Sequence, residues 1–202
     1  MVQIPQTYPT IPQPIATFDF EDIANNTGVV ILFGISSETD GGVDYHLVPN
    51  KAFSSQSETN RTSSGTTTID FDLGTFNLPR TAKGTAYFSA NIGAATNIIV
   101  KVLVQLKHVT NSTETNITSE ITSQSVTTGS GVSSEMVFLE LPITEKHFKK
   151  GDFLRLTVKL NTNGTNGAVG HDPNNGDGTV VLGSADKITT VMELQMPFRI
   201  DI

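Results

Sequence analysis

The segment from 97 to 109 reads Asn-Ile-Ile-Val-Lys-Val-Leu-Val-Gln-Leu-Lys-His-Val and alternates strictly between two sets of side chains. One set is wholly apolar and consists of Ile98, Val100, Val102, Val104 and Leu106. The other set holds the polar residues Lys101, Gln105 and Lys107 together with two apolar ones. Because successive side chains of a strand point to opposite faces of a sheet, this period of two predicts a strand whose apolar set faces a core.

Segments on both sides of it follow the same rule. Residues 67–73 place Asp70 and Asp72 on one face and larger apolar residues on the other, and residues 153–160 alternate in the same way. Residues 27–36 contain the fully apolar run 29–33, which predicts a central strand buried on both faces. Further strands are expected at 15–20, 45–48, 84–93, 135–142 and 187–202, and a single helical turn is expected at 144–150.

Three polar stretches, 50–67, 110–134 and 161–186, predict long loops between these strands. The count is about eight to ten strands with no helix of three turns or more. This pattern favours an all-β fold, a two-sheet antiparallel sandwich of jelly-roll type that spans 17–202 as a single domain. Residues 1–16 carry four prolines and are expected to form an extended arm. That arm has two interpretations, a tether to a neighbouring subunit or a frayed terminus.

The net charge is −7, the pI is near 5.0, and the chain has no cysteine. Disulfides, iron–sulfur clusters and thiolate zinc sites are therefore excluded. The acidic balance argues against a nucleic acid partner, which needs clustered lysines and arginines. The basic cluster Lys146, Lys149 and Lys150 is interpreted as a solvated turn before a strand. No run approaches the ~18 apolar residues of a membrane span, and no signal peptide is visible at the N-terminus.

Motifs that would indicate catalysis are absent from the sequence: it has no Gly-x-Ser-x-Gly elbow, no His-Glu-x-x-His and no phosphate-binding glycine loop. The four histidines form no short-range pair and are expected at the surface near strand ends. Asp70 and Asp72 share one wet face, which leaves two interpretations open. They are either a carboxylate pair for glycoside hydrolysis or an ordinary solvated strand face. The sequence as a whole predicts a protein that is not an enzyme.

The segment 170–179 gathers Asp and Asn oxygens in a glycine-rich turn. Hard cations prefer such oxygens, so Asp172, Asn174 and Asp177 are candidate calcium ligands. The spacing departs from that of an EF-hand, and the same residues are ordinary turn formers, so a plain loop is the alternative. No other cofactor is expected. Aromatic residues are sparse, and Tyr45 and Tyr87 are the candidates for stacking against a sugar.

Residues 146–158, Lys-His-Phe-Lys-Lys-Gly-Asp-Phe-Leu-Arg-Leu-Thr-Val, resemble the turn before the penultimate strand of many jelly-roll domains, and Pro197 to Ile202 would form the last strand. The proline-rich arm, the Thr/Ser/Asn-rich loops and the absence of Cys and Trp resemble virion structural proteins of phages and archaeal viruses.

This resemblance implies a non-enzymatic structural protein located in the virion. It would be a capsid, minor capsid or decoration subunit that forms a homo-oligomer and binds itself and other virion proteins. The alternative is an extracellular carbohydrate-binding module, with or without calcium.

Overall fold

The computed structural model describes residues 27–39, 42–49, 58–62, 64–94, 97–127, 133–164, 167–171, 179–182, 186–189 and 192–199. Every regular element in these ranges is a β-strand, so the all-β prediction is confirmed. The expected arm at 1–16 lies outside the described residues, as do Asp172, Asn174 and Asp177. The interpretations of these two segments therefore stay predictions.

Eight of the described strands have seven residues or more: β1 (Thr27–Thr39), β2 (Gly42–Val48), β4 (Gly65–Leu73), β5 (Arg80–Ala94), β6 (Ile99–Thr110), β10 (Ser133–Phe148), β11 (Phe153–Thr162) and β15 (Met192–Arg199). The shorter ones are β3 (Glu58–Thr62), β7 (Thr113–Asn116), β8 (Ile121–Thr122), β9 (Val126–Thr127), β12 (Gly167–His171), β13 (Thr179–Leu182) and β14 (Asp186–Thr189). Most of the short strands fall within the stretches that the sequence predicts as loops. They form because extended backbone pairs its N–H and C=O groups with a neighbouring strand even where core side chains are few.

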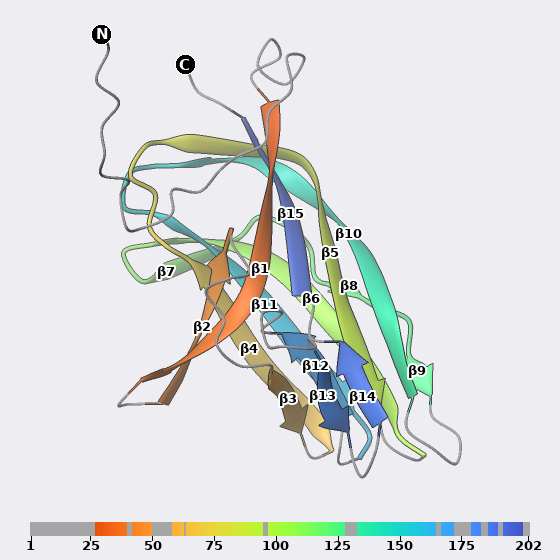
Figure 1. Ribbon diagram of the computed structural model, residues 1–202. Helices are drawn as coiled ribbons and strands as arrows, with labels where there is room; N and C mark the ends of the chain where they lie inside the picture. Colours follow the sequence, from red (N-terminus) through yellow and green to blue (C-terminus); the bar gives the residue numbers. More distant parts are fainter. Residues whose placement is uncertain are drawn as a thin grey trace, which may run out of the picture.

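Thirteen of the described strands belong to one curled sheet (Figure 1). Its path runs β3-β12-β5-β15-β1-β2-β4-β11-β6-β7, while β10 pairs with β5, and β8 and β9 pair with β6. β13 and β14 form a separate pair. The pairing of β2 with β4 is parallel and joins only His46 to Asp72 and Leu47 to Leu73, whereas the other pairings are antiparallel.

The long strand β1 connects the two halves of this sheet. Its residues 27–33 pair with β15, and its residues 33–39 pair with β2. Across the interior, β5 and β10 contact β6, and β11 contacts β12, so the sheet curls until its two halves face each other. The expected jelly-roll sandwich would have two separate sheets. Here backbone hydrogen bonds along β1 and β2 join the two halves into one sheet, so the two-sheet arrangement is not confirmed.

The core lies between these halves and follows the predicted alternation. Val100, Val102, Val104 and Leu106 are fully buried, and the lysines of the same strand lie on the opposite face. Leucines and a valine of β11, together with Phe71 and Phe88, complete the interior. Burial of apolar surface at about 25 cal/mol per Å² is the main term that favours such a fold.

Two expectations about individual strands are wrong. Val29 and Ile31 are 45% and 44% exposed, although their neighbours Val30 and Leu32 are buried, so β1 is not buried on both faces. The reason is that no described element covers its outer face. The helical turn expected at 144–150 is also wrong, because β10 continues to Phe148 with a register shift after Ile143.

Candidate functional site

The outward side chains of β4, β11, β6 and β7 form a polar face. In the register of these strands Arg155 lies opposite Asp72 and Lys107, and Thr157 lies opposite Asp70. Side chains that are directly opposite on neighbouring strands share a face and lie close enough to interact. The polar residues that the sequence places on several separate strands are therefore brought together in one network.

Arg155 is the centre of this network. Its Nε and Nη2 atoms donate to the two carboxylate oxygens of Asp72, both at 2.6 Å, and Nη1 donates to Glu114 at 2.5 Å. Nη1 is 3.7 Å from Asp70, whose carboxylate accepts a hydrogen bond of 2.6 Å from the hydroxyl of Thr157. This two-point contact with Asp72 uses the fork geometry that distinguishes arginine from lysine.

Two groups of this network, Arg155 and Glu114, have shifted pKa values. The hydrogen bond to Asp72 raises the pKa of Arg155 above its ordinary value, although desolvation acts in the opposite direction. The hydrogen bond from Lys107 lowers the pKa of Glu114, with a smaller contribution from Arg155. The contacts therefore favour the charged forms of Arg155 and Glu114.

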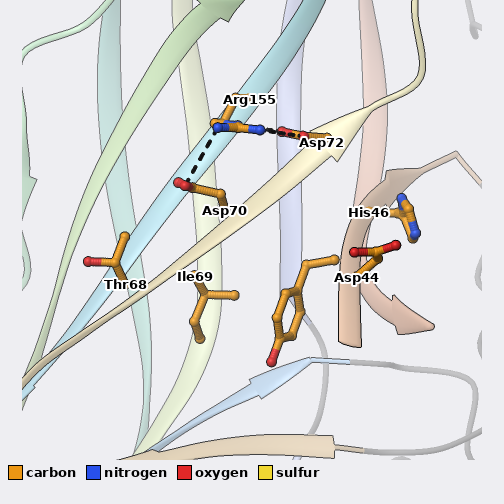
Figure 2. A pocket seen from close by; sticks show the side chains of 8 residues that line it. Asp44, His46, Thr68, Ile69, Asp70, Asp72 and Arg155 are labelled. Atoms are coloured by element: carbon orange, nitrogen blue, oxygen red, sulfur yellow. Dashed lines mark hydrogen bonds and ion pairs between the residues drawn. The ribbon is translucent and has the colours of Figure 1, made fainter. Parts of the chain in front are cut away.

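An open depression of about 450 Å³ lies beside this network, between β2, β4 and β11. In Figure 2, Asp70 and Asp72 both turn toward Arg155, while Asp44 and His46 lie on β2 at the other side. Both oxygens of Asp72 accept a hydrogen bond from Arg155. Asp70 and Asp72 lie on the same outward face of β4, as the alternation predicts, and both line this depression.

Two of the four histidines are not at the surface, contrary to expectation. His108 and His171 are 5% and 1% exposed. The ring of His171 packs edge-on against Tyr45 and Phe71, and the partly buried Tyr45 also lines the depression. Among the described residues, no group of three or more His, Cys, Asp or Glu side chains is placed to hold a metal ion.

His108 pairs with Asp152, across a distance of 2.8 Å between Nε2 and Oδ2. The same carboxylate oxygen accepts the backbone N–H of Lys149, and the His108 ring packs edge-on against Phe148. Asp152 therefore joins the turn between β10 and β11 to the end of β6.

The carboxyl group of Asp152 stays ionised in this buried place. Desolvation raises its pKa, but the hydrogen bonds from His108, from the Lys149 backbone and from Thr110 outweigh it and lower the pKa to about 2. The Nδ1 atom of His108 has no hydrogen-bond partner among the described residues and is enclosed by protein. The pair is closed to solvent and holds the turn in place.

The opposite outer side of the sheet, on β10, β5, β15 and β1, is different in character. It exposes Met136 and Phe138 (56% and 60%), Tyr87 (36%), and Val29 and Ile31. We call these five residues the apolar face. Gln195 of β15 lies opposite Ile31 of β1 on one side and opposite Tyr87 of β5 on the other. Ile31 and Tyr87 therefore face the same side of the sheet.

Two aromatic rings form the most exposed part of the apolar face. Tyr87 and Phe138 stack with their centroids 5.5 Å apart and their planes 23° from parallel. Next to them on β15, Gln195 donates a hydrogen bond of 2.9 Å to Glu193. The sequence analysis considered Tyr87 but missed Phe138, Met136, Val29 and Ile31.

A signal for this face exists in the sequence. Residues 29–33 and 136–139 are apolar at both odd and even positions, so each strand carries apolar side chains on both of its faces. Such runs indicate either burial on both sides or an exposed apolar surface, and the sequence alone does not distinguish these.

The open edge of β10 borders the apolar face. β10 has 16 residues and pairs with β5 along nearly its whole length, and no other described strand pairs with it. On its other side Thr144 N–H donates to the carbonyl oxygen of Ile117 at 2.9 Å, but no described strand forms a ladder there, and Pro142 and the register shift interrupt this edge.

No family model matches the chain, and no curated protein matches it. Among solved structures, a CocE/NonD family hydrolase from Staphylococcus aureus is similar with a TM-score of 0.48 and 12% identity over 87% of this chain and 37% of that one. A second structure of that hydrolase gives a TM-score of 0.45 at 10% identity, over 86% of this chain and 37% of the other.

An α-amino acid ester hydrolase gives a TM-score of 0.42 at 9% identity, over 84% of this chain and 35% of the other. The chain spans little more than a third of the length of these proteins. Within the described ranges, no helix is long and apolar enough to cross a bilayer.

Proposed function

We propose that this chain is a non-enzymatic structural subunit, of the capsid, minor capsid or decoration type, that assembles in a virion through protein–protein contacts. The observation that carries the proposal is the apolar face beside the open edge of β10. An exposed apolar surface on one side of a sheet is typical of a protein–protein interface. An unpaired edge strand offers main-chain hydrogen bonds to an incoming chain.

The polar face supports a non-enzymatic role. Its carboxylates are engaged by Arg155 and Thr157, and the buried His108–Asp152 pair is not accessible to a substrate. We also propose that the two facing halves of the curled sheet correspond to the two sheets of a jelly-roll sandwich, joined through β1 and through the two-residue contact of β2 with β4.

The test measures the mass of the chain in solution by sedimentation velocity over a range of concentrations. We expect a concentration-dependent oligomer that Phe138→Ser and Ile31→Ser weaken by about tenfold or more in Kd, because each removes an exposed apolar contact. Ile99→Ser is the matched control, since Ile99 is 41% exposed but lies on the polar side, on β6. A wild-type chain that stays monomeric throughout contradicts the proposal.

A carbohydrate-binding module is the second candidate, and one specific observation favours it. The stacked rings of Tyr87 and Phe138 form an exposed platform beside the amide of Gln195 and the carboxylate of Glu193. Sugars bind such sites through their apolar ring faces, and their hydroxyls bond neighbouring amides and carboxylates. Binding on a glycan array that is lost in Tyr87→Ala, with a monomeric wild type, would select this function over assembly.

A further inference from the structure

A basic surface gathers at one end of the molecule, where β5 begins and β10 ends (Figure 1). We call it the basic end, and it contains six of the chain's 13 lysines and arginines: Arg80, Lys83, Lys146, Lys149, Lys150 and Arg199. Strand pairing brings them together, because Lys146 lies opposite Ala82, and Arg199 lies opposite Thr81. The sequence analysis identified only the three lysines that are near one another in the chain.

The described acidic side chains at this end are already engaged. Glu145 pairs with Lys83 at 2.8 Å, and that hydrogen bond lowers the pKa of Glu145. Asp152 is buried against His108. Within the described part of the chain, Lys146, Lys149, Lys150 and Arg199 form no ion pair. The described residues of this end therefore carry more positive than negative charge, in a chain whose net charge is −7.

An exposed leucine lies in the loop at the same end. The loop between β4 and β5 is fixed to the lysine-bearing turn by two backbone hydrogen bonds, Phe76 N–H to Asp152 O and Gly151 N–H to Phe76 O, both at 2.9 Å. Phe76 packs inward against Phe148, whereas Leu78 is 71% exposed, more than any other large hydrophobic residue of the described ranges. Leu78 thus projects from a rigidly anchored loop that is bonded to the turn carrying Lys149 and Lys150.

We propose that the basic end docks on an anionic lipid bilayer. Clustered lysines and arginines are attracted to the negative surface of such a bilayer. An apolar side chain among them can enter the boundary between headgroups and acyl chains. A single-stranded nucleic acid is less well matched, because its bases stack on exposed aromatic rings and the aromatic rings at this end, such as Phe76, are buried.

The test is flotation of the full chain with vesicles of phosphatidylcholine alone, or of phosphatidylcholine and phosphatidylserine in equal parts. We expect binding to the mixed vesicles only, weakened by salt because the attraction is screened. The double variant Lys149→Glu, Lys150→Glu is expected to lose at least about tenfold in affinity. Leu78→Ser is expected to remove the binding that persists at high salt.

The matched control is the double variant Lys101→Glu, Lys107→Glu, which changes the net charge by the same amount but on the polar face. Its affinity for the mixed vesicles is expected to fall by less than about threefold. Equal losses in the two double variants would mean that only overall charge matters, and they would overturn the proposal. Displacement of the chain from vesicles by a short single-stranded DNA that binds more tightly would also overturn it. The oligomeric state of each variant, measured separately, keeps this result distinct from a failure of assembly through the apolar face.

Discussion

At the scale of the residue, the turn between β10 and β11 depends on two side-chain identities. Gly151 adopts a φ of 91°, a left-handed conformation that residues with a Cβ atom rarely take. Asp152 follows it and accepts hydrogen bonds from His108 and from the Lys149 backbone. At this turn, glycine is therefore favoured by the backbone conformation, and aspartate is favoured by the hydrogen bonds that its carboxylate accepts.

Replacement of Gly151 by alanine is expected to lower the free energy of unfolding by about 1–2 kcal/mol, because the left-handed conformation is strained once a Cβ is present. Space is not the cause, since nothing lies within 4 Å of that Cβ position. Gly74→Ala is the control, because Gly74 has equally open surroundings without the positive φ. Urea denaturation measures both, and equal effects of the two substitutions would contradict the explanation.

The lowered pKa of Asp152 leads us to expect that the free energy of unfolding decreases in acid. Its pKa is lowered from 3.8 to about 2, so the folded state binds the proton less readily than the unfolded state does. The stabilisation, about 2 kcal/mol, is fully present above about pH 4 and is lost as the pH falls toward about 2. Thermal melts should show this loss in the wild type and a smaller one in Asp152→Asn. An identical acid dependence of the two proteins would mean that Asp152 does not contribute.

At the scale of the element, β6 shows how alternation assigns each side chain to the core or to the surface. Leu106 is fully buried, whereas Leu103 lies among Lys101 and Gln105 on the polar side and is only partly buried. The two leucines have identical volume, so their different surroundings can be compared directly by the same substitution.

Leu106→Ala is expected to cost about 2–5 kcal/mol of unfolding free energy, because it leaves a cavity and removes buried contacts. Leu103→Ala is expected to cost less than about 1 kcal/mol, as substitutions away from the core usually do. Chemical denaturation at neutral pH measures the two values. Similar costs for both would contradict the assignment of the two faces of β6.

At the scale of the whole molecule, the two outer sides of the sheet differ in how they meet solvent. The polar face compensates its charges internally through Arg155, and the apolar face leaves Phe138 and Met136 exposed. A net charge of −7 opposes the approach of identical chains, so charge and apolar contact act in opposite directions on self-association.

Self-association is therefore expected to strengthen as the pH falls from 7 toward the pI near 5.0, because the net negative charge declines. Added salt at neutral pH should act in the same direction by screening the repulsion. Light scattering at fixed protein concentration measures both effects. This pH range lies above the one in which Asp152 is protonated, so unfolding does not account for a change there. Association that weakens on salt addition would indicate an interface held by ion pairs instead.

The period of two along the chain determined much of the fold by itself. The buried set from Val100 to Leu106 and the wet face of Asp70 and Asp72 could be assigned from the sequence, because strand geometry ties each side chain to one face. Runs that are apolar at every position, as in 29–33, could not be assigned in this way. Only the packing around them decides whether their second face is covered.

The sequence alone determined an all-β chain and the side of most strands that faces the core. The tertiary structure decided which strands meet, and with that the surfaces that carry the proposals. Arg155 meets Asp72, Tyr87 meets Phe138, and Arg199 comes near Glu145 only after residues far apart in the chain are paired. The physical reason is that alternation depends on neighbours in the chain, whereas charge compensation and exposed patches depend on the register between strands.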